Sequence, residues 1–479
     1  MKRLLLLLTV AAGCPAGYQA TALPSWVSDT GSYTPRTQAV KSFIDTYREP
    51  AAKIITAARA DRGAYQKLAQ LTDRIGHRLS GSPELERAIA WAAQTMKDDG
   101  HDVRTEPVMV PHWVRGAEDA AITAPIQRPL RIIGLGGTVP TRGAIVAPVV
   151  VVRSWEQLEQ QADKVKGALV LYDVAMPTWT EENGSGYGDV VQFRTRGPSR
   201  AAKLGAAAVL MRSVTARSLR TPHTGALTYE PALPKIPAAA VTVEDSQLIA
   251  RLAEKGPVTV RLRLESQNLP DAKSANVIGE LRGRELPDEV VVIGGHIDSW
   301  DVGQGAHDDG AGVVTMMQAL TTLRKLGLVP RRTVRVVLFT NEENGTRGAK
   351  AYAETHAGEL AKTVLAVESD SGGFSPRGFS VESKQERAVA RIADIASLLA
   401  PIGATRVRAG HSGADVGPME PGGVPLVGLE VDNRAYFDYH HSAADTLDKV
   451  DPQQLADDVA AVAVLAYVAA DLPNRIDAP

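Results

Sequence analysis

One segment of the chain, residues 290–314, concentrates side chains that bind metal ions or carry protons. It reads VVVIGGHIDSWDVGQGAHDDGAGVV, a hydrophobic run that ends in two glycines and continues into imidazoles and carboxylates. The side chains of this kind within the segment are His296, Asp298, Asp301, His307, Asp308 and Asp309. Hydrophobic runs of this length form buried strands, and sites in α/β proteins lie where such strands end. The segment is therefore a candidate catalytic or metal-binding site.

Three later hydrophobic runs end in side chains of the same chemistry. These are Glu342 and Glu343 after RTVRVVLFT, Asp370 after TVLAVES, and Asp432, His440 and His441 after VPLVGLE. A single aspartate after a strand is usually a turn former, but several carboxylates at one rim repel one another and need a cation. Because Cys14 is the only cysteine, imidazole and carboxylate must bind that cation. Zn²⁺ is the first candidate, with Mn²⁺ and Co²⁺ as alternatives.

The number of candidate ligands indicates two metal ions rather than one. A catalytic zinc ion typically takes three protein ligands, whereas two neighbouring ions can share a bridging carboxylate. His296 and Asp370 could serve one ion, and Glu343 with a histidine of the pair 440–441 could serve the other. Asp308 would then lie between the two ions.

Two acidic residues remain beside these ligands. Asp298 lies two positions after His296, so in an extended segment both side chains point the same way, and Asp298 can accept the imidazole N–H. Glu342 and Glu343 are adjacent and point apart. One of them can bind a metal ion while the other accepts a proton from acidified water and passes it to a leaving amine.

Strands and helices alternate from about residue 272 to the C-terminus, which predicts an α/β fold. The strands are nearly continuous runs of Val, Ile and Leu, as expected for a mostly parallel sheet covered by helices on both faces. Residues 36–75 carry helical spacing, and a further helix begins after Ser82 with Pro83 in its first turn. Near the C-terminus, Asp451 is expected to cap an apolar helix that belongs to the core rather than to a membrane.

Residues 120–265 have a different texture. Short apolar runs alternate with Gly, Pro and polar turns, and VTVRLRLESQ alternates apolar and polar side chains. One helical segment, SRAAKLGAAA, lies among these runs. This pattern predicts a β-rich domain inserted into the α/β domain, which is then built from residues 23–119 and 266–479.

Residues 1–22 have the layout of a secretory signal peptide. Lys2 and Arg3 precede an apolar run that is too short to span a membrane, and small residues follow. The sequence AAGC offers Cys14 as a candidate lipid anchor, whereas the small residues at 20–22 offer an alternative cleavage site. The protein is therefore expected to be exported, either as a secreted or periplasmic protein or as a membrane-anchored lipoprotein. The net charge of −2 does not provide the excess of positive charge that is typical of a nucleic-acid-binding protein.

The motifs GGHIDSWDVGQGAHDDGAG, NEENGTRGA, ESDSGGF and HHSAADT resemble the co-catalytic zinc exopeptidases. That family includes bacterial leucyl aminopeptidases, glutamate carboxypeptidase and transferrin receptor. The segment HIDSWDVGQGA is similar to the corresponding sequence in the carboxypeptidase Q group (plasma glutamate carboxypeptidase). The resemblance to the family covers most of residues 40–475. It implies a zinc exopeptidase fold in which the inserted segment is similar to a protease-associated domain that shapes or covers the cleft. Homodimers are a further expectation, because family members often form them.

The resemblance also implies roles for individual residues. The ligands that it implies for two Zn²⁺ ions are His296, Asp308, Glu343, Asp370 and His441. The family pattern His-x-x-x-Asp/Glu-Thr fits the segment that begins at His441, which favours His441 over His440. Glu342 is the implied catalytic base and Asp298 its helper. In the family, the peptide bond after the bridging aspartate is often cis, which here is the bond after Asp308.

Three residues do not follow directly from the family pattern. His307 stands before the bridging aspartate, where an apolar residue is expected, and is either an additional hydrogen-bond donor behind the ligands or an exposed side chain. His411 and Asp415 either line a substrate pocket or belong to a plain polar loop.

The implied function is hydrolysis of dipeptides or short peptides, as in the carboxypeptidase Q group. The alternative is an aminopeptidase of the same family. The two activities differ in the group that anchors the substrate terminus: an acidic group would hold an ammonium, whereas Arg or Lys would hold a carboxylate. A receptor-like binding module on this fold would be expected to lack some of the ligands. This chain retains all five together with the base.

Overall fold

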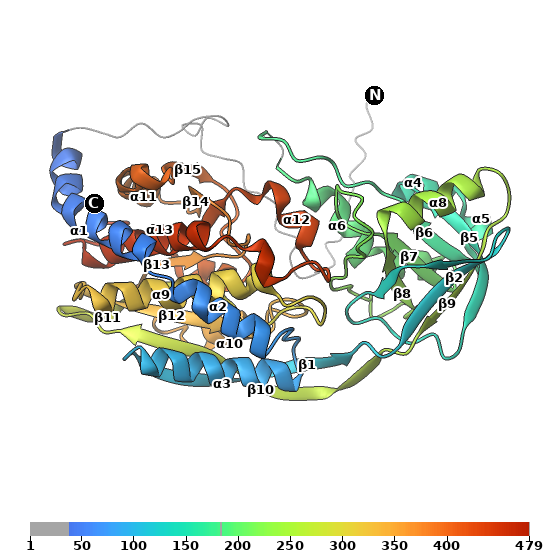
Figure 1. The fold of residues 1–479 in the computed structure, drawn as a ribbon, viewed down its shortest axis with the longest axis horizontal. Helices are drawn as coiled ribbons and strands as arrows, with labels where there is room; N and C mark the ends of the chain where they lie inside the picture. Colours follow the sequence, from blue (N-terminus) through green and yellow to red (C-terminus); the bar gives the residue numbers. More distant parts are fainter. Residues whose placement is uncertain (1–37, 183, 479) are drawn as a thin grey trace, which may run out of the picture.

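The computed structural model describes residues 38–182 and 184–478, so the signal-peptide and Cys14 predictions lie outside the described residues. The chain forms two lobes, each built on its own sheet (Figure 1). The strands of the larger lobe, in sheet order, are β1 (Asp102–Val114), β10 (Gln267–Leu281), β12 (Arg332–Phe339), β11 (Leu286–His296), β13 (Thr363–Glu368), β16 (Leu426–Val431), β14 (Pro376–Glu382) and β15 (Arg406–Ala409). The central four strands, β12, β11, β13 and β16, run parallel. This is the mixed α/β sheet that the sequence predicts.

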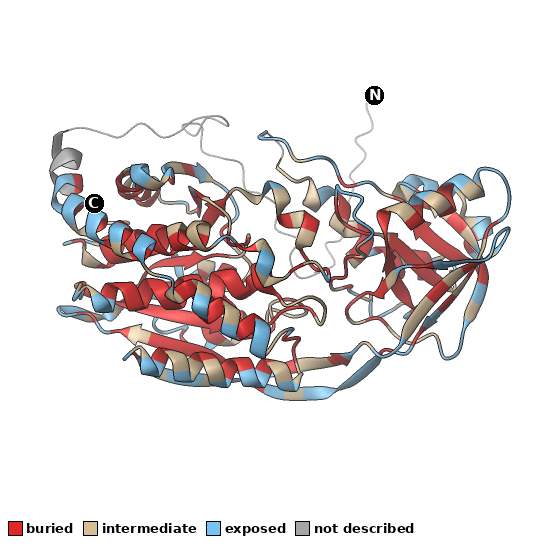
Figure 2. Cartoon of the chain, in the orientation of Figure 1, coloured by how far each residue is buried: buried red, intermediate tan, exposed pale blue. Residues whose placement is uncertain are grey.

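Helices cover both faces of the larger sheet. They are α1 (Gln38–Ala60), α2 (Gly63–Arg74), α3 (Pro83–Asp98), α9 (Ala311–Lys325), α10 (Arg347–Thr355), α11 (Glu386–Ala396) and α13 (Pro452–Asp471), whereas the short α12 (Tyr436–Tyr439) lies toward the second lobe (Figure 1). Alternate residues of β11 enter different cores: Val291 and Ile293 pack with α9 and α13, whereas Val290 and Val292 pack with α10. Buried residues accordingly run through the central strands and the helices against them (Figure 2). Because helices cover both faces of the sheet, the edge at the carboxyl ends of its parallel strands is the place where a site can form.

The predicted helix starts are confirmed. The Ser82 hydroxyl accepts a hydrogen bond from the backbone N–H of Leu85 at 3.1 Å, with Pro83 in the first turn. The Asp451 carboxylate accepts the N–H groups of Gln453 and Gln454 at the start of α13. Among the described residues, α13 is the one helix long and apolar enough to cross a membrane, but 83% of that window is buried inside the protein. It is therefore a core helix, as expected.

The second sheet is formed by residues that lie between β1 and β10 in the sequence. Its strands, in sheet order, are β3 (Arg128–Leu130), β2 (Glu118–Ala124), β9 (Thr259–Leu264), β5 (Ile145–Val152), β6 (Leu169–Tyr172), β7 (Ala208–Arg212), β8 (Ala238–Val241) and β4 (Ile132–Gly134). The segment contains more helix than the single one expected from the sequence: α4 (Trp155–Gln160), α5 (Ala162–Val165), α6 (Tyr187–Thr195), α7 (Gly197–Lys203) and α8 (Val243–Ala253). The long pair β1 and β10 connects the two lobes, and α6 lies beside α12 between them (Figure 1).

Candidate metal centre and substrate cavity

The candidate ligands converge at the carboxyl edge of the central strands. His296 is the last residue of β11 and pairs in register with Phe339, the last residue of β12, so Glu342 and Glu343 follow at the same level. Asp370 lies two residues beyond the end of β13, whose Glu368 pairs with Gly294. Parallel strands that end in register bring side chains from distant parts of the sequence to one rim.

Two imidazoles face the two oxygens of one carboxylate. The His296 Nε2 lies 3.3 Å from Asp308 Oδ1 and 3.4 Å from Asp370 Oδ1. On the other side, the His441 Nε2 lies 3.3 Å from Asp308 Oδ2 and 3.0 Å from Glu343 Oε2. Asp308 is therefore placed between two separate groups of donors. The peptide bond between Asp308 and Asp309 is cis, as the family resemblance implies.

The donor set fits metal ions. Three atoms of the candidate ligands are buried without a hydrogen bond of good geometry: His296 Nε2, Asp308 Oδ2 and Asp370 Oδ1. A buried ionised group without a partner is costly, whereas a cation compensates several carboxylates at once. Imidazole and carboxylate without thiolate are a donor set that suits Zn²⁺.

The charges of the cluster favour a positive charge at both imidazoles. Burial opposes protonation of His441, but Glu343 and Asp308 raise its pKa to about 10. Burial likewise opposes protonation of His296, and Asp370 and Asp308 raise its pKa well above the usual value. Burial raises the pKa of Glu343 to about 7, with Asp308 adding to the rise. Carboxylates packed this closely around imidazoles create the negative potential that a cation would neutralise.

Asp298 acts on this cluster differently from the expectation. The His296 Nδ1 lies 3.1 Å from the backbone carbonyl of Asp298 and 3.8 Å from its carboxylate, so the carbonyl accepts the imidazole proton. The Asp298 carboxylate instead accepts the backbone N–H groups of Glu342 at 3.0 Å and Glu343 at 3.3 Å. The carboxylate thereby fixes the peptide groups of the two adjacent glutamates.

Glu342 is suited to holding a proton. Burial raises the pKa of its carboxyl well above the usual value, and Asp370 and Glu343 add to the rise against the opposing charge of His296. A carboxyl group with a raised pKa beside an electrophilic centre can exchange protons with water near neutral pH.

Polar side chains behind the candidate ligands hold the backbone of their loops in place. Asp445 accepts the backbone N–H groups of His307 at 2.7 Å and Asp308 at 3.1 Å. Arg78 is fully buried and donates to the backbone carbonyls of Ile297, Gln304 and Gly305. Sequence reasoning did not find Arg78, because an arginine after a helix carries no local signal for a partner more than 200 residues away.

Three of the other candidates from the sequence do not join the cluster. Asp301 forms an ion pair with Arg115, and Asp432 pairs with Arg377 and Arg434. His307 is buried rather than exposed: it stacks on Phe374 with ring centroids 4.3 Å apart, and its Nδ1 accepts the N–H of Gly373.

His411 and Asp415 differ in whether they line the cavity beside the cluster. His411 lines the cavity beside the cluster, whereas Asp415 is fully buried and is not among the residues that line it. Burial raises the pKa of Asp415 well above the usual value, with Glu368 adding to the rise.

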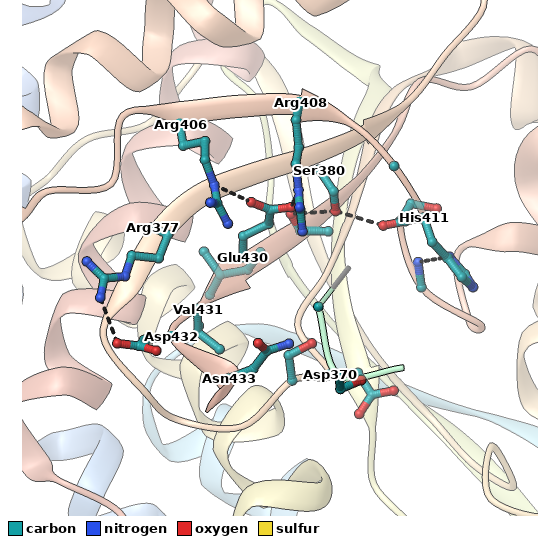
Figure 3. Close-up of a pocket in the computed structure, with 18 of the residues that line it drawn as sticks. Asp370, Arg377, Ser380, Arg406, Arg408, His411, Glu430, Val431, Asp432 and Asn433 are labelled. Carbon is teal, nitrogen blue, oxygen red and sulfur yellow. Dashed lines mark hydrogen bonds and ion pairs between the residues drawn. The ribbon is translucent and has the colours of Figure 1, made fainter. Parts of the chain in front are cut away.

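A cavity of about 920 Å³ opens beside Asp370 (Figure 3). Arg377, Arg406 and Arg408 lie along one wall, where Glu430 pairs with both Arg406 and Arg408. Near the cluster, the wall contains Glu368, whose Oε2 accepts the N–H groups of Asp415 and Val416 and whose Oε1 is buried without a hydrogen bond. The cavity is therefore cationic along one wall and acidic next to the candidate ligands.

Residues of the second sheet's lobe also close this cavity. The Trp179 Nε1 donates to Asn433 Oδ1 at 3.2 Å, and Glu181 pairs with Arg406 at 2.6 Å. Both residues come from the segment between β6 and α6. The cavity is thus formed by both lobes.

A rim of imidazoles and carboxylates over an α/β sheet, beside a cavity of this size, is an arrangement typical of a metal-dependent enzyme. The model of peptidase family M28 matches residues 276–466. Carboxypeptidase Q of Mus musculus is 39% identical over 443 residues, which cover 91% of this chain and 92% of that protein. Carboxypeptidase Q of Xenopus laevis is 40% identical over 444 residues, with the same coverage. The chain belongs to peptidase family M28 and is a metallopeptidase.

Solved structures agree with this assignment. A peptidase M28 precursor from Shewanella amazonensis SB2B has a TM-score of 0.86 at 35% identity, covering 90% of this chain and 98% of that one. BSAP, a zinc aminopeptidase from Bacillus subtilis, has a TM-score of 0.64 at 20% identity, covering 87% and 96%. The second likeness shows a shared fold.

Proposed function

We propose that this protein is an exported di-zinc exopeptidase that hydrolyses dipeptides or short peptides, as its similarity to carboxypeptidase Q suggests. The observation that carries the proposal is the position of Asp308, whose two oxygens face His296 and His441 separately. A single ion would not need a carboxylate in that position, whereas a bridged pair does. Zinc is also the metal named for the aminopeptidase BSAP.

The proposed ligands form two groups that share Asp308. His296 and Asp370 belong to one group, and His441 and Glu343 to the other. His441 is preferred to His440 because its Nε2 lies within 3.3 Å of two carboxylates, whereas the His440 Nε2 lies 3.7 Å from Asp308. Bound zinc ions would supply Lewis acidity toward water and the scissile carbonyl.

Glu342 is the proposed base. Its carboxylate accepts a proton from the attacking water and donates it to the nitrogen of the leaving amine, so the two proton transfers use one side chain. Asp298 supports this role by holding the N–H of Glu342 and that of the neighbouring Glu343.

The two poles of the cavity favour a substrate with both termini free. Burial raises the pKa of Glu368 to about 8, so its Oε1, buried without a partner beside Asp370, would ionise and accept a hydrogen bond when a substrate ammonium is bound there. On the opposite wall, Arg406 and Arg408 share the carboxylate of Glu430, Arg406 also pairs with Glu181, and Arg377 and Arg434 share Asp432. Four guanidinium groups thus meet three carboxylates, which leaves an excess of one positive charge. Such an excess suits a substrate carboxylate. A dipeptide carries these two opposite charges at its ends.

The proposal extends to the arrangement of the chain. Residues 1–22 are the proposed export signal, with Cys14 a candidate lipid anchor, and residues 120–265 the proposed protease-associated-like insertion. The peptidase domain is then built from residues 23–119 and 266–479, and a homodimer is the proposed assembly.

The test of the catalytic assignment is Glu342→Gln. This variant should retain zinc, measured by metal analysis, and lose most dipeptide hydrolysis, because the amide cannot accept the proton of water. Glu354→Gln, on the exposed face of α10, is the matched control and should retain wild-type activity. Wild-type turnover by zinc-loaded Glu342→Gln would remove Glu342 as the base.

The test of the substrate class compares a free dipeptide, its N-acetyl and C-amide derivatives, and an aminoacyl-nitroanilide. The dipeptide should have the highest kcat/KM, and each blocked derivative should lose part of it. Equal or faster hydrolysis of the aminoacyl-nitroanilide would instead support the aminopeptidase alternative. Glu368→Gln should lower kcat/KM for the free dipeptide more than for the N-acetyl derivative.

A further inference from the structure

The segment His223–Gly225 of the inserted lobe lies directly against His441. The backbone N–H of Thr224 donates to the carbonyl of His441 at 2.9 Å. The neighbouring His223 Nδ1 lies 2.7 Å from the carbonyl of His440. Two residues of the insertion therefore engage the backbone of two consecutive residues that lie about 217 positions further along the chain.

His441 requires such support because of its backbone conformation. Its φ is +58°, in the left-handed region that a residue with a Cβ atom seldom adopts. Holding a non-glycine residue there costs about 1–2 kcal/mol, so the surrounding structure must determine the conformation. The hydrogen bond from Thr224 is one of the contacts that do so.

The same segment also determines which nitrogen of His441 carries the proton. The His441 Nδ1 lies 3.3 Å from the carbonyl oxygen of Thr224, and a carbonyl oxygen can only accept. Nδ1 therefore donates and keeps its proton, so Nε2, which faces Asp308 and Glu343, is the nitrogen whose lone pair would bind a metal ion once the ion displaces its proton. A hydrogen bond of this kind behind a metal-binding histidine fixes both the tautomer and the orientation of the ring.

Arg194 of α6 holds the Thr224 carbonyl in place. Its Nη1 donates to that carbonyl at 3.2 Å, and its Nη2 donates to the Tyr187 hydroxyl at 2.8 Å. The guanidinium is buried beneath Gly225, where a Cβ atom would overlap it. Arg194 Nη1 also lies 3.5 Å from His441 Nδ1, but both nitrogens lie nearer to the Thr224 carbonyl, at 3.2 and 3.3 Å, so we take that oxygen as the acceptor for both.

The segment is anchored within its own lobe. The Thr224 hydroxyl donates to the carbonyl of Gly134 at 2.8 Å, and the N–H of His223 donates to Ser213 Oγ at 2.9 Å. The Ser213 hydroxyl in turn donates to the carbonyl of Val241, at the end of β8. The position of the Thr224 carbonyl is thus set by the second sheet rather than by the sheet that carries the ligands.

We propose that the inserted lobe completes the metal centre, with Arg194 and the backbone of Thr224 as positioning groups for His441. The inference rests on the proposed role of His441 as a ligand, and it gives the insertion a function beyond covering the cleft. Removing Arg194 should loosen the ring of His441 and lower zinc affinity, since such supporting contacts are worth about 10- to 100-fold in metal affinity.

The experiment measures zinc affinity by chelator competition on the full-length protein, together with kcat, KM and the circular dichroism spectrum. Arg194→Met should weaken zinc binding about tenfold or more and lower kcat, with little change in KM. Arg194→Lys retains one donor for the Thr224 carbonyl and should recover part of the affinity. Arg212→Met is the matched control: Arg212 belongs to the same lobe and pairs with Asp173, so zinc affinity should stay at the wild-type level.

Two further variants separate the outcomes. If His441→Ala binds zinc as the wild type does, the ligand assignment fails and this inference fails with it. If His441→Ala loses zinc while folded Arg194→Met binds it with wild-type affinity, only the positioning role is refuted. Should Arg194→Met not fold, Tyr187→Phe decides, because it removes only the hydroxyl that holds Arg194. A several-fold loss of zinc affinity in that variant supports the role, and unchanged affinity overturns it.

Discussion

Replacement of Asp298 by asparagine tests how the rim positions Glu342. The Asp298 side chain is fully buried, and its two oxygens accept the N–H groups of Glu342 and Glu343 at 3.0 and 3.3 Å. An asparagine of the same size keeps one acceptor oxygen and places an NH₂ group where the second oxygen was. The backbone carbonyl that accepts from His296 Nδ1 is unchanged by the substitution.

The magnitude follows from the loss of one hydrogen bond to a charged group. Such a bond contributes about 1.5–3 kcal/mol. If that free energy holds Glu342 in its reactive position, each ~1.4 kcal/mol corresponds to a factor of about ten in rate. The expected fall in kcat is therefore about 10- to 150-fold.

The assay is steady-state hydrolysis of a dipeptide at saturating zinc, with the zinc content of each variant measured in parallel. Asp301→Asn is the matched control, because Asp301 lies in the same loop but pairs with Arg115 outside the cluster. Its kcat should equal that of the wild type. A kcat within twofold of wild type for Asp298→Asn refutes the reasoning, and loss of zinc as its main effect would show that the carboxylate acts on His296 instead.

Three other predictions concern the metal, a glycine and pH. Removal of zinc with a chelator should lower the melting temperature in calorimetry, because free zinc at 1,000 times its Kd stabilises the folded state by about 4 kcal/mol; an unchanged melting temperature after proven zinc loss would contradict a structural contribution of the metal. Gly312→Ala should weaken zinc binding, because its Cβ would overlap the Asp309 carboxylate and the Ser369 carbonyl, whereas Gly256→Ala, in open space, should not; equal zinc affinities would argue against the packing reason. Burial lowers the pKa of His101 from 6.5 to about 4, so the unfolded chain takes up a proton first and stability should fall as the pH drops from about 6.5 toward 4. His101→Gln should reduce that fall in urea unfolding at pH 7 and pH 5, and an identical pH dependence would show that His101 does not contribute to it.

Several features of the fold followed from local patterns. The sequence identifies Ser82 and Asp451 as helix caps because a cap depends on residues within one helical turn. It also identifies the buried strands, because nearly continuous apolar runs are stable only in a sheet that is covered on both faces. The β-rich texture of residues 120–265 did not reveal helices such as α8 (Val243–Ala253), because short amphipathic helices between buried strands resemble apolar runs.

The sequence by itself determined which side chains were available for a metal centre, because the ends of parallel strands must meet at one rim. Only the tertiary structure decided which groups touch. Local spacing predicts that the Asp298 carboxylate accepts the N–H of the His296 imidazole. In the structure the backbone carbonyl of Asp298 accepts that N–H, and the carboxylate accepts the backbone N–H groups of Glu342 and Glu343. The contact of Thr224 with His441 joins two lobes across 217 positions of sequence. No periodicity records such a contact, because it depends on how two separately folded sheets pack against each other.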